Sequence, residues 1–533
     1  LKIMQRYTTI LRKSAGLAVL VLTAALASCT TGFERLNTDP DAVKKVDLKG
    51  FITTMQIDVI PCSDIDANQF QRSCNLCGDI FSGYMAAIGL DTRSNIDYYL
   101  HYDLDWNDHA FNVAYTQVLA AWKKLQTAYK NGKISDDIWA VAQILKVATM
   151  HRVTDMYGPI PYSKFGEVTV APYDSQSEVY ARFFEELDAA TATLRDFVDN
   201  TIKPLQEVDL AFGGDYGKWY RFANSLKLRL AMRMVYADAA NARTYAEQAV
   251  RDGVMIGNSD IAQIKSTNGI MVYNPLNVCW DSYENCRIGA ALDSYMNGYE
   301  DPRRPAFMLL STESEDGGYH GVYPGLAGGE TKNQYTAMSS PNVMKDTPVQ
   351  WMNYAEVCFL RAEGAARGWE MGGTAEELYN AGIKASFEQY NIAGAEAYSQ
   401  LTDKKPAGFV DAALTGKDKA AVSSVTIKWS ESATLETKLE RIITQKWIAM
   451  WPNGQEAWSE YRRTGYPKLF PVAKNQSDGE IDSNKQIRRM VYPRHEYSGN
   501  RTEVMTAVKL LNAESKNPAN GDTGGVQVWW DRK

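Results

Sequence analysis

The sequence predicts an all-α (α-rich) fold of tetratricopeptide-like helical hairpins, with long loop excursions and at most short strands. Three observations favour this class. Apolar residues recur at helical spacing in several long segments, helix-start signals precede some of them, and Val/Ile-rich alternation is scarce. With 533 residues, 45% of them hydrophobic and 23% charged, the chain is long enough to bury a large core.

The N-terminus has the layout of a secretory signal. A basic stretch precedes the apolar run Ala15–Ala27, which is too short to span a bilayer because a span needs about 20 residues. The run ends in Leu26–Cys29, which resembles the lipobox of bacterial lipoproteins. We therefore expect residues 1–28 to be a lipoprotein signal peptide, residues 29–533 to be the mature domain, and Cys29 to carry the lipid that holds it on a membrane. The alternative is an ordinary signal peptide cut nearby, with Cys29 an incidental thiol.

The charge balance argues against a polyanionic partner. The chain has 57 Lys and Arg against 64 Asp and Glu, a net charge of −7. Removing residues 1–28, which contain four bases and no acid, changes −7 to −11. Such an acidic domain is a poor candidate for binding nucleic acid by counterion release.

Several helices have recognisable starts or apolar faces. Ser175 and Glu178 form a capping box before a stripe of Val179, Phe183 and Leu187, and Thr374 with Glu377 forms another. Three further helices are predicted from stripes at helical spacing: Trp219, Phe222, Leu226 and Leu230; Ala355, Phe359, Ala362, Ala366 and Trp369; and Leu439, Ile443, Trp447 and Met450. The Ala-rich stripe would let two helices approach closely, as in stacked helical hairpins.

Cys74 and Cys77 form a CxxC pair that could indicate redox chemistry. The surrounding apolar residues Leu76, Ile80, Tyr84 and Ile88 instead read as one face of a helix, without the strand of a thioredoxin-like unit. Buried thiols or a local disulfide are therefore favoured over redox catalysis.

No catalytic, cofactor or metal motif is evident. The five histidines include no i, i+4 pair, so no metal site is indicated. The segment Gly213–Lys218 resembles the end of a P-loop but lacks the Ser or Thr after the Lys. We expect a protein that is not an enzyme. Sequence spacing cannot show two carboxylates facing each other across a cleft, so a surface-anchored all-α glycosidase or lyase remains the alternative.

Aromatic residues are numerous, with 13 Trp and 30 Tyr, and are the remaining candidates for ligand contacts. Aromatic faces can stack on sugar rings, and most such residues on helical stripes belong to the core. Two loop-rich regions, residues 91–112 and 257–349, carry aromatics outside these stripes. The candidate ligand-binding residues are Tyr98, Tyr99, Trp106 and Asn107 in the first region and Trp280, Tyr283, Tyr319 and Tyr323 in the second.

An ordered set of segments resembles the SusD/RagB family of nutrient-binding outer-membrane lipoproteins, in its SusD-like branch from Bacteroidota. These segments are residues 33–40, 151–163, 213–233, 299–304, 354–369, 443–469, 488–500 and 529–531. The resemblance implies an α-helical domain, lipid-anchored in the outer membrane at the cell surface and seated on a SusC-like TonB-dependent transporter. Its implied role is to capture an oligosaccharide or other nutrient and deliver it to that transporter.

Most of the matching residues are expected to serve the fold rather than the ligand. Glu456, Arg462, Arg463 and Tyr466 look like a polar cluster, in which buried charges must pair to be tolerated. Ligand residues vary within the family, so the resemblance assigns none here.

Overall fold

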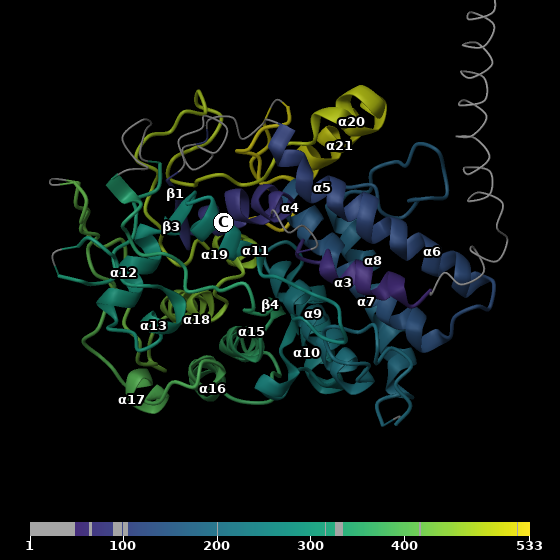
Figure 1. Cartoon of the computed structure of the whole chain (residues 1–533), viewed down its shortest axis with the longest axis horizontal. Coiled ribbons are helices and arrows are strands. Elements are labelled where there is room, and N and C mark those ends of the chain that lie inside the picture. Colours follow the sequence, from purple (N-terminus) through teal and green to yellow (C-terminus); the bar gives the residue numbers. More distant parts are fainter. Residues whose placement is uncertain are drawn as a thin grey trace, which may run out of the picture. The chain divides into compact units, whose positions relative to one another are not determined.

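The computed structural model confirms an α-rich fold of packed helical hairpins (Figure 1). It describes residues 48–62, 67–88, 99, 105–199, 201–314, 316–325, 334–414, 417–519 and 521–533. Consecutive helices pack against each other in α6 to α10, and α15 packs against α16 and α18. The bounds of these helices are α6 Leu119–Lys130, α7 Asp136–Tyr157, α8 Gln176–Arg195, α9 Tyr216–Arg233, α10 Ala239–Asp252, α15 Tyr354–Ala366, α16 Ala375–Gln389 and α18 Leu435–Ala449.

Both predicted capping boxes form. The Glu178 backbone N–H donates to Ser175 Oγ at 3.3 Å, and the Ser175 N–H donates to Glu178 Oε2 at 2.9 Å, which starts α8. Thr374 and Glu377 exchange the equivalent bonds at 3.2 and 2.9 Å at the start of α16. Each box satisfies two backbone donors that the first turn of a helix leaves unpaired.

The predicted apolar stripes are mostly buried in the helices that they specify, except that α15 ends at Ala366, and Trp369, which follows the left-handed Gly368, is half-buried outside it. Trp219, Phe222 and Leu226 lie on the inner face of α9. Small residues bring α15 and α16 close, since a Cβ added at Gly382 would lie 2.7 Å from Phe359. Residues Phe51–Lys533 form one compact unit.

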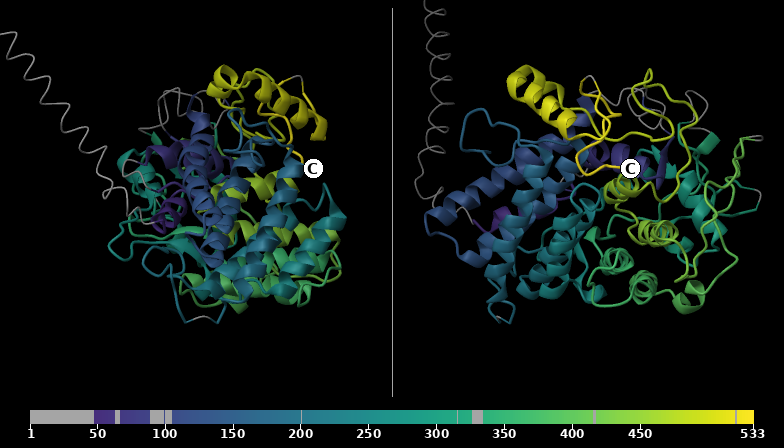
Figure 2. Two further views of the ribbon diagram at one scale, coloured as in Figure 1. Left: turned by 90° about the vertical axis from the view of Figure 1, so that its right-hand side faces the viewer. Right: turned by 180° about the vertical axis from the view of Figure 1, so that it is seen from behind.

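The remaining helices are either short or lie in the last third of the chain. In Figures 1 and 2, α20 and α21 lie at the opposite end of this unit from α16 and α17. Glu514 of α21 accepts a hydrogen bond from the Gln176 N–H at 2.9 Å, which ties α21 to the start of α8. The other helices are α3 Gly50–Ile57, α4 Asn68–Phe70, η1 Gln71–Asp79, η3 Asp105–Asp108, α5 His109–Val113, η4 Ala114–Val118, η5 Asn258–Asp260, α11 Pro275–Asn277, η6 Val278–Ser282, α12 Ala290–Gly298, α13 Arg304–Phe307, α17 Ala395–Ser399, α19 Gly454–Thr464, α20 Arg494–Gly499 and α21 Arg501–Glu514.

Strands in the described part of the chain are three or four residues long and form two antiparallel pairs. β1 Met85–Ala87 pairs with β3 Cys286–Ile288, and β2 Ala262–Ile264 pairs with β4 Val349–Met352. No helix among the described residues has the length and apolar character of a membrane span.

One predicted helix ends earlier than its apolar spacing suggests. The helical stretch that contains Leu76 and Ile80 stops after Phe81, and Tyr84 lies in a bend before β1. Gly83 has a φ of +77°, a left-handed conformation that ends the helix. The prediction of one helix through Ile88 was wrong because pairing with β3, far along the chain, makes this segment extended.

A buried ion network joins the helical layers. Arg229 binds Glu356 at 2.7 Å, Arg233 contacts Glu456, Glu460 binds Lys446 at 2.9 Å, and Arg463 bridges Glu460 and Glu363 at 2.7 and 2.6 Å. Because each ion contacts at least one opposite charge, the cost of burying it is offset. The ion network comprises Asp155, Glu356, Glu363, Glu456 and Glu460 with Arg229, Arg233, Arg367, Lys446 and Arg463.

Only part of the expected polar cluster belongs to this network. Glu456 and Arg463 are members. Arg462 instead donates to the backbone oxygens of Asp155 and Arg488 and stacks over Trp458, with its guanidinium 3.7 Å from the ring centre. Tyr466 donates to Glu436 at 2.9 Å, outside the network.

Candidate ligand-binding surface

The β1–β3 ribbon positions the segment that carries Trp280 and Tyr283. Ala87 at the end of β1 is paired with Cys286 at the start of β3, and the Ile88 N–H donates to Asn285 O at 2.9 Å. The chain that carries Trp280 and Tyr283 therefore enters β3 at the end of the ribbon where the chain leading toward Trp106 leaves β1. Trp106 is positioned through η1 instead, because η3, which carries it, contacts η1, and η1 also contacts α11, which directly precedes η6 and Trp280.

Trp106 lies in η3 and is held by η1. The Arg72 guanidinium lies 4.7 Å from the centre of the Trp106 ring, within range of a cation–π interaction. Arg72 Nη1 lies 3.1 Å from His109 Nε2, and His109 Nδ1 lies 2.9 Å from Asp108 Oδ1. Partial burial alone would raise the pKa of Asp108, but the hydrogen bond with His109 lowers it below its ordinary value. The half-buried indole is thus backed by a chain of polar groups.

Trp280 is held by backbone carbonyl and guanidinium contacts. Its Nε1 donates to Val343 O at 2.9 Å, and its own carbonyl accepts from Arg287 Nη1 at 3.0 Å. Arg287 is buried and also donates to Thr336 O at 2.8 Å, and burial lowers its pKa. The Trp280 indole is half-buried, so its edge is fixed while part of its surface faces solvent. Tyr283 follows and is also half-buried.

Both tryptophans adjoin π-helical turns. η1 supplies Arg72, η6 contains Trp280, and both are π-helices. η1 packs against both η3 and α11. π-Turns are rare and are found frequently at functional sites. Close backbone packing anchors η1, since a Cβ at Gly78 would lie 2.5 Å from Gln455 of α19. We refer to Trp106, Trp280 and Tyr283 as the aromatic surface.

Two other predicted aromatics, Tyr319 and Tyr323, lie at the other end of the β1–β3 ribbon. Val322 bridges to Gly289, past the far end of β3, so Tyr319 and Tyr323 adjoin that end of the ribbon. Tyr323 is 5% exposed and packs between Phe409 and Phe470. Tyr319 is half-buried beneath the Arg304 guanidinium, 5.6 Å from its ring centre.

The remaining predicted site residues are Tyr98, Tyr99, Asn107 and Cys29. Tyr99 is 2% exposed and its ring centre lies 6.4 Å from that of Phe81 in the core. Tyr98 and Cys29 lie outside the described residues, and for Asn107 the structure describes only its place in η3. Sequence reasoning did not identify Arg72 or Arg287, because their role depends on contacts across the fold.

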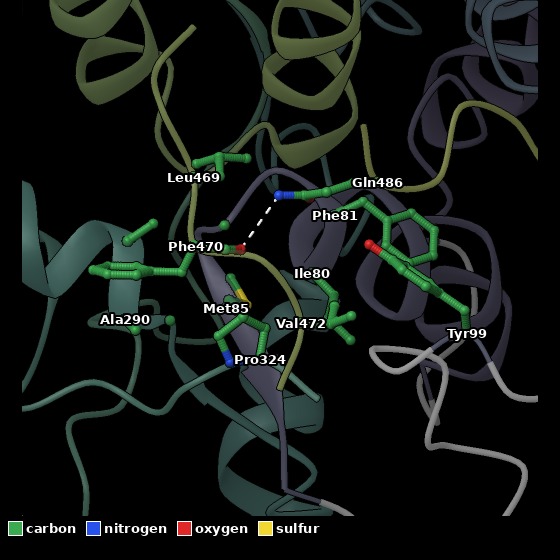
Figure 3. Close-up of a pocket in the computed structure, with 13 residues that line it drawn as sticks. Ile80, Phe81, Met85, Tyr99, Ala290, Pro324, Leu469, Phe470, Val472 and Gln486 are labelled. Atoms are coloured by element: carbon green, nitrogen blue, oxygen red, sulfur yellow. Dashed lines mark hydrogen bonds between the residues drawn. The ribbon is translucent and has the colours of Figure 1, made fainter. Parts of the chain in front are cut away.

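An apolar pocket lies beside Tyr99 and Phe470 (Figure 3). Gln486 Nε2 donates to Phe470 O at 3.3 Å across its edge. The cavity volume of this pocket is only about 20 Å³. This space suits about one water molecule and not a sugar ring. We therefore regard it as a packing defect rather than a ligand site.

A second recess lies between α6, α7 and α8, and its aromatic rings are already covered. Trp122 has Trp139 at 5.7 Å and the Lys146 ammonium at 4.4 Å from its ring centre. Trp139 also stacks on Tyr129 at 5.1 Å. Lys146 is paired with Glu186 at 2.7 Å. Both tryptophan rings of this recess pack on another ring or a cation, whereas the Trp280 ring has no such partner among the described residues, so this recess is a weaker candidate than the aromatic surface.

The thiols are buried and unpaired with one another. Cys62, Cys74, Cys77, Cys279, Cys286 and Cys358 are all free. Burial raises the pKa of each, to about 11 for Cys358 and about 12 for Cys286, which disfavours the reactive thiolate. Among the described residues, no group of three or more His, Cys, Asp or Glu is placed to hold a metal ion.

Comparison with known proteins identifies the family. The model for "SusD-like: SusD and RagB outer membrane lipoprotein" matches residues 34–531. A chitin-binding SusD homologue from Flavobacterium johnsoniae is similar, with 41% identity and a TM-score of 0.84 over 91% of this chain and 98% of that one. A SusD homologue from Bacteroides thetaiotaomicron has 37% identity and a TM-score of 0.84 over 92% and 100% of the two chains.

A further solved structure, described as a chitin-binding protein, has 28% identity and a TM-score of 0.70 over 91% of this chain and 100% of that one. A search of curated protein sequences gives no significant match. The family model spans nearly the whole chain, and the structural matches cover both partners almost completely. The chain therefore belongs to the SusD-like family of SusD and RagB outer membrane lipoproteins.

Proposed function

We propose that this protein is a cell-surface lipoprotein that binds an oligosaccharide and delivers it to a SusC-like TonB-dependent transporter. The observation that carries the proposal is that Trp106 and Trp280, each half-buried and fixed at one side, lie on elements around η1: η3 carries Trp106 and contacts η1, and α11, which η1 also contacts, leads directly into η6 with Trp280. Rigid aromatic faces bind sugar rings at little entropic cost, and neighbouring polar groups can bond hydroxyls.

The ligand class that we propose is an oligosaccharide of the chitin type. Two similar structures are described as chitin-binding, one of them 41% identical to this chain. The polar groups beside Trp106, namely Arg72, His109 and Asp108, supply donors and an acceptor for hydroxyl or acetamido groups. The family membership supports the proposed location at the outer membrane.

Calorimetric titration of the mature domain tests the proposal. Chitooligosaccharides are the first probes, with maltooligosaccharides and cellooligosaccharides as alternatives. We expect Trp280→Ala to weaken binding at least severalfold, whereas Trp139→Ala, a half-buried tryptophan in the α6–α8 recess, leaves affinity unchanged. A wild-type domain that binds none of these glycans refutes the proposal.

Binding and cleavage are distinguished in the same samples. We propose a binding protein and not a glycosidase or lyase, so chromatography after prolonged incubation should recover the oligosaccharide intact. Shorter products that accumulate in proportion to protein concentration would contradict this and favour the enzyme.

Anchoring and delivery need separate experiments. We propose that residues 1–28 are removed and that Cys29 of the 29–533 domain is lipidated. Cys29→Ala should leave the protein unprocessed or soluble, and equal recovery of this variant with outer membranes would contradict lipidation. Delivery predicts co-purification with a TonB-dependent transporter, and loss of glycan uptake when the protein is removed.

A further inference from the structure

His109, the first residue of α5, lies between a cation and an anion. Arg72 Nη1 lies 3.1 Å from His109 Nε2, and His109 Nδ1 lies 2.9 Å from Asp108 Oδ1. A guanidinium group can only donate hydrogen bonds, so Nε2 is the acceptor and carries no proton. Nδ1 therefore carries the ring proton and donates to Asp108. Only the neutral imidazole makes both hydrogen bonds at once.

Protonation of His109 turns its contact with Arg72 into a repulsion. The cationic ring has a proton on each nitrogen, so Nε2–H points at a guanidinium 3.1 Å away. Asp108 attracts the cationic ring and holds it, so Arg72 is the group that moves. Arg72 is free to do so, because its Nε has no hydrogen-bond partner and its bond to His109 is the only one that its guanidinium makes to the described residues.

The place of Arg72 matters because the same guanidinium supports Trp106. It lies 4.7 Å from the centre of the half-buried indole ring, where a cation–π contact stabilises one orientation of the ring. When Arg72 moves away, the ring loses this contact, and a ligand that stacks on the ring has to restrain it again at a cost in affinity. The charge of His109 therefore reaches Trp106 through Arg72.

We propose that His109 is a positioning residue that makes glycan binding depend on pH: the neutral imidazole holds Arg72 against Trp106, and the protonated imidazole releases it. This inference rests on the proposed function, since Trp106 belongs to the aromatic surface. Histidine is the side chain whose charge ordinarily changes between about pH 5 and pH 8. The protein therefore binds glycan more tightly at neutral pH than at mildly acid pH.

A second histidine approaches the same carboxylate from α20. His495 Nδ1 lies 3.6 Å from Asp108 Oδ2, and His495 Nε2 lies 3.4 Å from Glu496 Oε1. The His495 ring also meets the Phe111 ring edge-on, at 6.2 Å between centres. Protonation of His495 strengthens its two ion pairs and brings no charge against Arg72. His495 is thus a natural control for His109.

The other titratable groups in this neighbourhood are buried. Burial raises the pKa values of Tyr157 in α7 and Cys77 in η1 above their ordinary values, so both stay neutral below pH 8. At the end of η1, burial raises the pKa of Asp79 to about 7, and this carboxylate accepts from Asn75 Nδ2 at 3.2 Å. Because Asp79 also changes charge near neutral pH, the experiment has to separate it from His109.

Affinity at two pH values in variants of residue 109 makes this separation. Wild type, His109→Gln and His109→Leu are titrated at about pH 8 and about pH 5 with the N-acetylglucosamine hexamer, or with the maltose- or cellulose-type hexamer that binds in its place. The glutamine amide offers Arg72 an acceptor at both pH values, and leucine offers none. We expect wild type to bind about two- to fivefold more weakly at the lower pH. His109→Gln should bind equally at both, and His109→Leu should bind at both as weakly as wild type does in acid.

His495→Gln is the matched control and should keep the pH dependence of wild type, since it removes the other histidine beside Asp108. Arg72→Met should bind weakly at the higher pH and lose nothing further in acid, because protonated His109 then faces no cation. Urea denaturation checks that each variant is folded at both pH values.

The outcomes separate this inference from the proposed function. If His109→Gln keeps the pH dependence, if His495→Gln abolishes it, or if wild type binds equally at both pH values, His109 does not control binding. The proposed function stands in each of these cases, provided that Trp280→Ala still weakens binding. If wild type binds no glycan at either pH, both fail together.

Discussion

The ion network and the aromatic surface are both assembled from segments far apart in the chain, but different contacts hold them in place. In the ion network, charged side chains from α7, α9, α15, α18 and α19 neutralise one another in the core. In the aromatic surface, backbone carbonyls and the guanidinium groups of Arg72 and Arg287 hold half-buried rings on short irregular elements. The first arrangement stabilises the fold, and the second leaves ring surface available to a ligand.

This difference predicts which substitutions change stability and which change binding. Glu460 contacts Arg463 and Lys446 at 2.7 and 2.9 Å and Arg233 at 3.4 Å. Glu460→Gln removes the charge that neutralises all three, so we expect the free energy of unfolding to fall by roughly 3 to 5 kcal/mol. Urea denaturation at pH 7 measures it.

The control for this substitution is Glu185→Gln, which breaks an exposed pair with Arg182. That pair spans 2.7 Å, but its side chains are 63% and 56% exposed. Solvent screening limits such a pair to under about 1 kcal/mol. Equal losses in the two variants would show that the ion network does not dominate stability.

Acid should weaken the protein through the same carboxylates. Burial alone would raise the pKa of Glu456, but the guanidinium groups of Arg233 and Arg229 lower it to about 2 from an ordinary value of 4.5. A carboxyl whose pKa is lower in the folded state stabilises the fold above its unfolded pKa and loses that effect as pH falls.

Glu456 alone therefore contributes roughly 3 kcal/mol, which should disappear between about pH 4.5 and pH 2. The pKa values of Glu363 and Glu460 are also lowered, because at both residues the effect of neighbouring cations outweighs the effect of burial. Urea denaturation at a series of pH values measures the slope. A stability that is constant through this range would contradict the ionised state of the network.

The two regions also differ in how far the sequence predicts them. Local signals such as the Ser175–Glu178 box and the Trp219 stripe predicted helices that the structure confirms. Polar character near Glu456 was recognisable, but its partners Arg229 and Arg233 lie more than 200 residues earlier, so sequence spacing could not identify them.

The aromatic candidates were selected because they lie outside helical stripes, and this criterion cannot separate Trp106 and Trp280 from the buried Tyr99 and Tyr323. What distinguishes them is exposure, since both tryptophans are half-buried, and exposure depends on tertiary contacts such as the β1–β3 pairing beside Trp280. Each strand has three residues, which is too short for a clear alternating pattern, and the pairing joins positions about 200 residues apart. The arrangement of the aromatic surface therefore depends on tertiary contacts.

Trp106→Ala should weaken binding rather than stability, the opposite of what we expect for Glu460→Gln. We expect glycan affinity to fall by about 1 to 3 kcal/mol, while the free energy of unfolding changes by about 1 kcal/mol or less, because the indole is half-buried. Trp219→Ala, in the fully buried core of α9, should instead cost roughly 3 to 5 kcal/mol of stability. Calorimetric titration and urea denaturation of both variants measure the two quantities. A large stability loss in Trp106→Ala with unchanged affinity would place Trp106 in the core.

The smallest effect concerns the cation that supports Trp106. Arg72 lies 4.7 Å from the Trp106 ring centre and 3.1 Å from His109, so Arg72→Met removes a cation–π contact and a polar neighbour while retaining an apolar chain. We expect glycan affinity to fall by about 0.5 to 1 kcal/mol, with no change in the free energy of unfolding beyond the same range. Arg304→Met is the matched control, since Arg304 lies 5.6 Å from the Tyr319 ring centre near the other end of the ribbon. If titration shows that Arg304→Met weakens binding as much as Arg72→Met does, the ligand also contacts the neighbourhood of Tyr319, and the aromatic surface is larger than Trp106, Trp280 and Tyr283. If only Arg72→Met weakens binding, the ligand contacts the Trp106 side and not the Tyr319 side.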